Sequence, residues 1–353
     1  MKRVSGASIQ DNKFVIIRGL NDRYNAAYLN GAPLPSSESD RKAFSFDIFP
    51  SNMLDNLMII KTARPDLPGE FAGGIIDITT KSIPDKNFIS ISASGGYNSI
   101  TTRKEQLYYK GGKRDWLGMD DGSRAMPEEI PDYLDFPLND HERGKLAKNV
   151  PVSDWSLYNK KFAPNQSYQF TTGYNFKLKE RDFFGALLSL SYNKTNNFFT
   201  TVRRSYDNQA EVVSTLANDY FDKTYSSQVL LGALLNLSCK INDNHSISSK
   251  NLYSINSDDR TIYRTGSVLP TDPNPQIMKS YAMWFTQNNI ISSQLIGDHY
   301  IPSAKIKINW VGSYSDIQRS VPNLRRQLYL KFDHINDPQN PLATDTMYQT
   351  QMA

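Results

Sequence analysis

The sequence has few of the residues on which most catalytic, metal-binding or disulfide-stabilised proteins depend. Cys239 is the single cysteine in 353 residues, which excludes an intramolecular disulfide framework. Burial habits favour packing of this thiol within a strand. The histidines lie far apart, and no His-x-x-x-His, Cys-x-x-Cys or EF-hand spacing occurs. They are His141, His245, His299 and His334. We therefore expect no enzyme activity, no cofactor and no metal site.

The chain also lacks a strong charge of one sign and a long apolar run. It carries 40 Lys and Arg against 36 Asp and Glu, a net charge of +4, which excludes bulk attraction to nucleic acid. No run approaches the roughly 18 apolar residues of a membrane helix. A membrane β-barrel is not excluded by this, because its strands alternate polar and apolar residues.

Three short patterns have ordinary explanations. Residues 111–114 follow no apolar strand and open no helix, so they are not a phosphate-binding loop. Residues 120–122, Asp-Asp-Gly, are better explained as a plain turn than as a calcium site. His245 and Ser246 begin an expected strand, and nothing marks them as part of a lipase-like pair with an orienting partner.

Residues 57–81 are the stretch around which the chain is organised. Two short runs rich in β-forming residues, 57–60 and 75–80, predict strands. The connector between them holds two prolines and three glycines, so it can form neither a regular helix nor a strand. The residues themselves therefore predict a compact unit of strand, loop and strand.

Further elements are expected upstream of this unit. Phe14–Ile17 is an unbroken apolar run and predicts a buried strand. Asn30-Gly31 is a two-residue hairpin signal, and Pro33 places the second arm at the edge of its sheet. Ser51 predicts a cap for one short helical turn. Together these elements predict a small α+β unit without room for a large core of its own.

Four motifs follow one another within residues 14–81. They are a strand ending in Arg-Gly (14–19), an Asn-Gly-x-Pro hairpin (28–34), a run leading to a Lys-ended strand (47–61), and a Pro/Gly loop with a Gly-Gly pair before Ile-x-Ile-x-Thr-Lys (65–81). In this order they resemble the end of the plug domain of TonB-dependent outer-membrane receptors. Residues 65–71, Pro-Asp-Leu-Pro-Gly-Glu-Phe, are similar to the Bacteroidetes-type branch, where others carry Tyr-Gly. That departure leaves the substrate class open.

After a linker at residues 83–86, the pattern changes to long alternating strands. Apolar and polar residues alternate in 89–97, 167–178, 185–193, 229–237 and 304–315. Such alternation also occurs in soluble sandwiches. Strands of roughly ten or more residues favour a membrane barrel, as do aromatic residues near strand ends. The order of connections also favours a membrane barrel, because long connections at 96–167, 199–225 and 260–281 alternate with short ones. We expect a mainly β fold: a small α+β plug remnant, then antiparallel strands of an incomplete transmembrane β-barrel.

The expected domains are an N-terminally incomplete plug at residues 1–82 and the first strands of a C-terminally incomplete barrel at 88–353. We expect about seven strands, whereas plugged transporters of this kind need about 22. No signal peptide is visible at the N-terminus, so the chain is expected to be a piece of a longer protein. The connection at residues 101–165 is long and rich in charge and aromatics. Loops of that length are usually functional, and we expect a lid over the outer vestibule.

The resemblance implies a transporter of the cell outer membrane. A receptor of this family takes up a scarce ligand, such as an iron–siderophore, cobalamin, an oligosaccharide or a peptide, through a plugged barrel. Energy would come from the TonB complex, through a segment that precedes this sequence. The lipid bilayer and a surface lipoprotein lid are further implied partners, and nucleic acid is not one. Transport would be a change of plug conformation without covalent chemistry.

Six residues are expected to serve the site. Arg18 closes an apolar strand and should be partly buried, where a guanidinium needs a carboxylate partner. The resemblance implies that it latches the plug to the barrel wall; an ion pair inside the plug is the plainer alternative. The other five lie in outer plug loops, where family members touch their ligand, and solvated turns are the alternative there. They are Asn21, Asp22, Arg23, Tyr24 and Arg41.

A surface β-sandwich adhesin that binds glycans through Tyr- and Trp-rich loops is the second hypothesis. It predicts a protein that is soluble without detergent, whereas the transporter predicts aggregation or a requirement for detergent. Strands folded back on each other as a dry two-layer stack would favour the adhesin.

Overall fold

The computed structural model describes most of the chain. The described residues are 5–10, 13–38, 43–65, 67–69, 71–84, 86–125, 127–131, 135, 137, 139–149, 155–178, 181–208, 214–268, 276–322, 324–332 and 349–352. Within them the chain is mainly β, as expected, with small N-terminal sheets, a long antiparallel sheet and one short α-helix, α1 (Asp140–Ala147). None of the helices in these ranges is long and apolar enough to cross a membrane.

The N-terminal residues form a small unit of two sheets. β1 (Ala7–Gln10) pairs with β2 (Phe14–Ile17), and a second sheet has the order β4-β3-β6-β5. Its strands are β3 (Asn25–Leu29), β4 (Ala32–Pro33), β5 (Leu54–Ile60) and β6 (Gly74–Thr80). β3 and β6 are parallel, and the other two pairs are antiparallel. The predicted strands and the hairpin between β3 and β4 are confirmed, with Pro33 in the edge strand, where its missing N–H is tolerated.

Three single 3-10 turns complete the small unit: η1 (Asp22–Tyr24), η2 (Phe46–Ile48) and η3 (Ser51–Met53). η3 lies where a short helical turn was expected. The cap prediction is wrong, however, because Pro50 occupies the N-cap position and Ser51 is already inside the turn. The turn is therefore held by its backbone, through the Met53 amide and the Pro50 carbonyl oxygen (3.0 Å).

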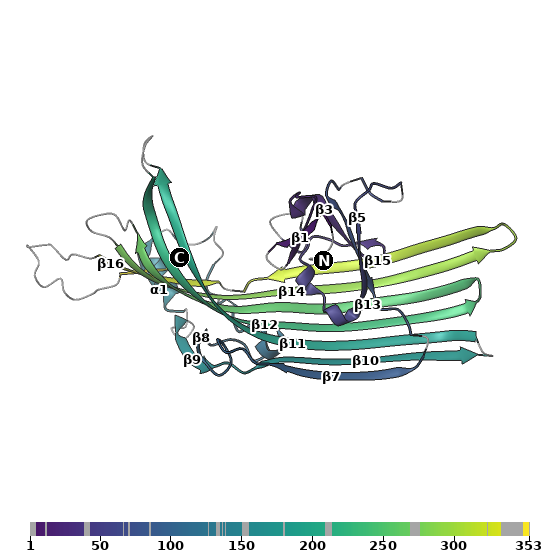
Figure 1. Ribbon diagram of the computed structural model, residues 1–353. Coiled ribbons are helices and arrows are strands. Elements are labelled where there is room, and N and C mark those ends of the chain that lie inside the picture. The colour runs from purple at the N-terminus through teal and green to yellow at the C-terminus, as the bar shows by residue number, and fades with distance from the viewer. Residues whose placement is uncertain are drawn as a thin grey trace, which may run out of the picture.

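A nine-stranded antiparallel sheet makes up most of the molecule (Figure 1). Its order is β17-β16-β14-β13-β12-β11-β10-β7, and β15 also pairs with β14. The strands are β7 (Phe88–Gly96), β10 (Asn165–Leu178), β11 (Arg181–Asn208), β12 (Ser214–Asn242), β13 (His245–Val268), β14 (Gln276–Ile301), β15 (Ile306–Ser320), β16 (Arg325–Phe332) and β17 (Gln349–Met352).

The four central strands are longer than the sequence suggested. β11 to β14 contain 28, 29, 24 and 26 residues. The connections expected at 199–225 and 260–281 are mostly strand, so those two predictions are wrong. Charged and polar residues interrupt the alternation there, but their backbones pair. Cross-strand ion pairs such as Arg264 Nε to Asp222 Oδ1 (2.6 Å) support the pairing.

The strand count also differs from the seven expected. The strand beside β14 is interrupted at residues 321–324, which include Pro322, and so appears as β15 and β16. Proline cannot donate to a ladder, which accounts for a break at this point. β17 then adds a short strand at one edge.

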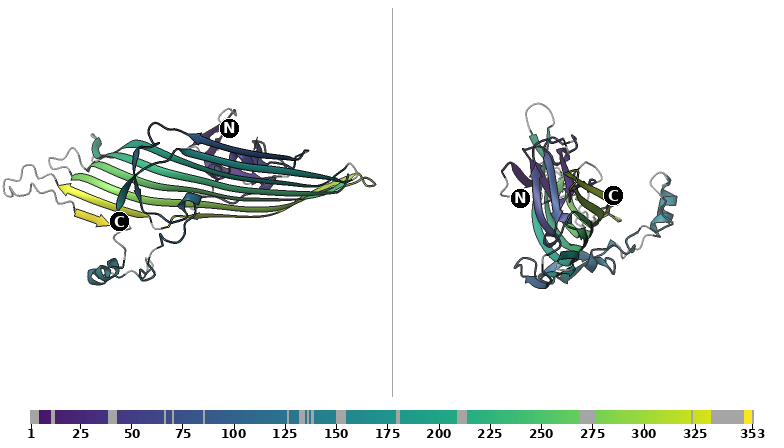
Figure 2. Two further views of the ribbon diagram at one scale, coloured as in Figure 1. Left: turned by 90° about the horizontal axis from the view of Figure 1, so that it is seen from below. Right: turned by 90° about the vertical axis from the view of Figure 1, so that its right-hand side faces the viewer.

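The two faces of the long sheet are different. We call the face that carries the small unit the inward face and the opposite one the outward face; Figures 1 and 2 show the small unit on one side only. On β11, Leu187 and Ser189 face inward and are buried, while Leu190 and Tyr192 face outward. This confirms the predicted alternation in residues 185–193. Leu190, Ala233, Tyr253 and Ile291 are successive cross-strand partners and form one outward row.

The long connection between β7 and β10 has secondary structure of its own. β8 (Glu105–Tyr109) pairs with β9 (Leu157–Lys161), and η4 (Asp115–Leu117) and α1 lie between them. In Figure 1, β8 and β9 lie on the side of the long sheet away from the small unit.

Candidate functional site

The small unit is seated on the inward face through one hydrophobic cluster. Its members come from the small unit and from the long sheet, and all are buried, so the contact excludes water. They are Ala27, Leu29, Phe44, Ile48, Phe49, Met53 and Ile78 from the small unit, and Leu187, Leu234, Leu252 and Ile290 from the long sheet. Each buried aliphatic side chain contributes about 1.5–3 kcal/mol. The long sheet therefore completes this core, while a smaller cluster at Val15, Ile17 and Ile76 lies within the small unit itself.

Glycines on the inward face allow the backbone of the small unit and its linker to approach closely. A Cβ on Gly232 would lie 2.5 Å from Pro50 Cγ, and one on Gly185 would lie 2.3 Å from Ile83 Cγ2. A Cβ on Gly173 would likewise meet Pro84 Cγ at 2.4 Å. Real Cβ atoms do not come this close, so a side chain at any of these places would displace its neighbour.

Asn30 connects the two parts by hydrogen bonds. It follows β3 with a positive φ of 49°, which Asn tolerates better than most residues. Its Oδ1 accepts from the Thr80 amide (2.9 Å) and from Lys250 Nζ (3.2 Å), and its Nδ2 donates to Gln294 Oε1 (3.0 Å). Gln294 Nε2 in turn donates to the Leu29 carbonyl oxygen (2.7 Å). The Asn30 side chain thus forms hydrogen bonds with groups of β6, β13 and β14 together.

Other side chains of the sheet donate to backbone carbonyls of the small unit and its linker. Ser254 Oγ donates to Ile48 O (2.5 Å), and Asn236 Nδ2 donates to Lys81 O (2.6 Å). Buried carbonyl groups need such partners. These two contacts hold the small unit on the sheet through neutral donors.

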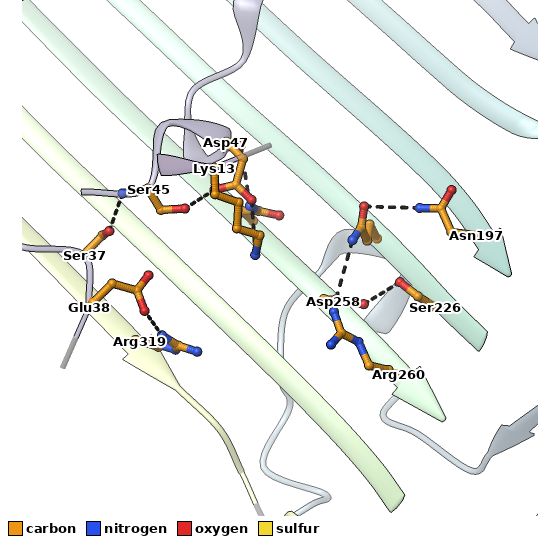
Figure 3. Close-up of polar contacts among 12 residues, drawn as sticks. Lys13, Ser37, Glu38, Ser45, Asp47, Asn197, Ser226, Asp258, Arg260 and Arg319 are labelled. Carbon is orange, nitrogen blue, oxygen red and sulfur yellow. Dashed lines mark hydrogen bonds and ion pairs between the residues drawn. The ribbon is translucent and has the colours of Figure 1, made fainter. Parts of the chain in front are cut away.

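A network of polar side chains lies on the inward face next to the small unit (Figure 3). Asp258 is its centre: it accepts from Ser226 Oγ (2.6 Å) and Gln228 Nε2 (3.5 Å) and forms an ion pair with Arg260. Asn197 Nδ2 donates to Gln228 Oε1 (3.4 Å). We call these five residues the Asp258 network.

The small unit presents its own charged groups beside this network (Figure 3). Lys13 Nζ lies 3.4 Å from Asp47 Oδ2, and Glu38 forms an ion pair with Arg319 of β15. Three buried polar atoms of this wall have no hydrogen-bond partner within the described residues: Arg260 Nε, Trp284 Nε1 and Asn288 Oδ1. Unpaired donors and acceptors on one wall are suited to binding a ligand with several hydroxyl or amide groups.

The residues expected to touch ligand have different roles in the structure. Asn21 caps η1 by accepting from the Arg23 amide, and Asp22 is buried, so both have local structural roles. Arg23 and Tyr24 are exposed and stack on each other, with the guanidinium 4.9 Å from the ring centre. These two side chains remain available for a ligand. Arg41 lies outside the described residues.

Arg18 is exposed, which makes the expected partial burial wrong. β2 ends at Ile17, and the chain turns at once through Arg18 and Gly19, whose φ values are 56° and 72°. A buried strand therefore ends before the arginine and leaves its side chain at the surface. The latch role implied by the resemblance stays a prediction.

The loop after β8 is attached to the outward face. Arg124, whose side chain is 3% exposed, donates to Asp115 through two nitrogens (2.6 and 2.7 Å) and to Asp120 (3.2 Å). Its Nη2 is 4.0 Å from Asp259 on β13, and its guanidinium lies 4.1 Å from the ring centre of Phe285 on β14. These described residues lie against the outward side of the sheet, and the lid expected over the vestibule stays a prediction.

Titration of this loop follows from its contacts. Burial lowers the pKa of the Arg124 guanidinium, but the hydrogen bonds and charge of Asp115 outweigh it, so the pKa is raised. Burial raises the pKa of the Tyr109 phenol beside it. Hydrogen bonds from the Ser123 side chain and from the Lys113 and Ser123 amides lower the pKa of Asp121 to about 2. Arg124 and Asp121 therefore stay charged near neutral pH.

The most specific contacts of the site were missed by sequence reasoning. The Asn30-Gly31 signal predicted the hairpin, but Lys250 and Gln294 are more than 200 positions away and carry no local signal. Arg124 was one charge among many in a polar loop. The described residues contain no cluster of three or more metal-ligating side chains.

Comparison with known proteins finds a weak structural likeness. No protein-family model matches the chain, and no curated protein matches its sequence. Among solved structures, the chain is similar to the outer membrane transporter YddB from Escherichia coli, with a TM-score of 0.26 and 9% identity over 99% of this chain and 53% of that one. The chain therefore spans about half the length of that transporter.

Proposed function

We propose that this chain is part of a TonB-dependent transporter of the bacterial outer membrane, in which the small unit is the plug and the long sheet is part of the barrel wall. The observation that carries the proposal is the difference between the two faces of one sheet. The inward face is covered by a unit whose larger hydrophobic core is completed by the sheet. The outward face of the same strands keeps large apolar side chains exposed, including Leu190, Leu235 and Ile291.

The outward face has the form expected of a lipid contact. A shallow apolar depression of about 430 Å³ runs across β7, β10, β11, β12 and β13, lined by residues such as Ile91, Phe170, Leu190 and Leu231. A bilayer-spanning strand needs about 9–11 residues, and β11 to β14 are more than twice as long. We propose that their halves near the short turns cross the bilayer and that the other halves, which carry the loop fixed by Arg124, project from it.

The transported ligand is proposed to bind between the small unit and the Asp258 network. Carboxylate, guanidinium and amide groups on this wall favour a ligand rich in hydroxyl or amide groups, such as an oligosaccharide or a peptide, over an apolar one. We propose that TonB supplies the energy for release, and that Arg23 and Tyr24 add contacts from the plug side. A surface lipoprotein is a further proposed partner.

Cell fractionation of the full-length gene product tests the assignment. The protein is expected in the outer-membrane fraction and should resist extraction by high salt and by alkaline carbonate, because its contact with lipid is apolar. A periplasmic enzyme and an inner-membrane protein serve as fraction controls. Recovery as a soluble, monodisperse protein without detergent would contradict the proposal and favour the glycan-binding adhesin.

A further inference from the structure

Two histidines meet where β13 begins and β14 ends. His245 and His299 are direct cross-strand partners in this antiparallel pair. Their Nδ1 atoms are 3.1 Å apart, and their ring centres are 5.3 Å apart. Both side chains are half-buried on the outward face, close to the short turns of the sheet and far from the Asp258 network. Neither the plug seat nor the loop fixed by Arg124 uses them.

The two nitrogens have the spacing of a metal chelate. With metal–nitrogen bonds of 2.0–2.1 Å, two ligand nitrogens lie about 2.9 Å apart at a right angle and about 3.3 Å apart at the tetrahedral angle. The observed 3.1 Å falls between these values. We propose that His245 and His299 form a two-histidine site for a divalent transition cation such as Zn²⁺, Cu²⁺ or Ni²⁺, for which imidazole is a preferred ligand.

The surroundings leave space for solvent ligands. A cavity of about 160 Å³ opens at the turns and is lined by His245, His299, Asp243, Asp298 and Tyr300 among others. Asp298 already accepts a hydrogen bond from Asn309 Nδ2, and the described residues hold no third histidine, cysteine or carboxylate placed as a ligand. Water therefore completes the coordination, and the ion is exchangeable.

The contact without a metal is a hydrogen bond in which one Nδ1–H donates to the other Nδ1. Binding needs both Nδ1 lone pairs, so the donating ring must exchange its proton from Nδ1 to Nε2 through solvent. Both rings stay neutral in this exchange, and the metal takes the place of one proton between the two nitrogens. The site thus ties two neighbouring strands together at their turn ends, a role that is separate from transport.

Trp310 provides a built-in reporter for this site. Its ring stacks on His299 with centres 6.3 Å apart and an angle of 26° between the planes. It packs over Gly297, where a Cβ would lie 2.3 Å from the indole Cε2 atom. A Cu²⁺ ion held by the histidine pair would be close enough to quench the emission of this tryptophan.

The test is a Cu²⁺ titration of the purified, untagged full-length protein, followed by tryptophan emission and by calorimetry. We expect saturable quenching with one ion per chain in the wild type, and none with Mg²⁺, which prefers oxygen ligands. His245→Asn and His299→Asn should each abolish the saturable phase. His141→Asn is the matched control, because His141 is exposed on α1 and its loss should change nothing.

Two tryptophan variants test which tryptophan is quenched while both histidines are kept. Trp310→Phe should lose the quenching but keep the calorimetric binding, and Trp116→Phe should keep both. Equal Cu²⁺ binding in wild type and in both histidine variants would overturn the proposal, and so would quenching that survives in Trp310→Phe. Absence of saturable binding to the wild type would show that the pair is only a hydrogen-bonded contact.

Discussion

Leu234 and Leu235 are neighbours on β12 and belong to opposite environments. Leu234 faces inward, is 0% exposed and packs against the small unit, whereas Leu235 faces outward and is 41% exposed. The same contrast repeats along the central strands. In a soluble sheet, a face without a partner layer would be polar. The inward face is therefore covered by protein, whereas the apolar side chains of the outward face fit the lipid contact proposed above.

Leu234→Ala should destabilise the protein more than any of the substitutions that follow. Removing a fully buried side chain from the seat costs about 3–5 kcal/mol, because a cavity remains between the sheet and the small unit. Leu235→Ala is the matched control and should cost much less. Urea unfolding of the detergent-solubilised full-length protein measures both. Equal losses for the two variants would mean that the faces are not distinguished as described.

Leu235→Arg tests whether the outward face contacts lipid or water. An arginine on the lipid side of a barrel strand near the middle of the bilayer costs about 2–4 kcal/mol. The same change at a water-exposed position is usually within about 0.5 kcal/mol. Unfolding in phospholipid vesicles should therefore show a larger loss of stability for Leu235→Arg than for Leu235→Ala. A neutral result in vesicles would break the membrane interpretation of this face.

Arg124→Met tests the part of the outward face that is covered by protein. It leaves Asp115, Asp120 and Asp259 close together without their cation. Loss of one partner of a buried ion pair costs about 3–5 kcal/mol, and we expect about 2–3 because these carboxylates keep some exposure. Limited proteolysis should then cut between residues 97 and 131. Arg143→Met, at an exposed pair on α1, should leave the digestion pattern unchanged.

Asn30→Gly should have the smallest effect of the four. Glycine keeps the positive φ, so the change removes only the amide that joins Thr80, Lys250 and Gln294. A lost hydrogen bond that leaves partners unpaired costs about 1–3 kcal/mol. Hydrogen exchange of the Thr80 amide should rise, while that of β11 should not. Asn52→Ala, which loses one 3.5 Å contact to Ser189, serves as the control.

The sequence predicted most of what depends on neighbours in the chain. Alternation placed Leu190 and Tyr192 on one face, and Asn30-Gly31 predicted the hairpin. It did not predict the outer halves of β11 to β14, since charged residues such as Arg203 and Asp222 interrupt the alternation there and resemble loop residues. Nor could it predict the burial of Arg124, which depends on Phe285 and Asp259 from distant strands. The exposure of Arg18 follows from a turn that begins one residue earlier than expected.

The three glycines beneath the small unit restrict how it can leave the sheet. Gly173, Gly185 and Gly232 lie on three different strands, and each receives Pro84, Ile83 or Pro50 in the space where a side chain would otherwise stand. A slide along the strands would bring those residues against neighbouring side chains at all three points. The small unit therefore cannot slide or rotate on the sheet while these contacts hold. If it is to leave the sheet, it has to begin by lifting off or by unfolding in place.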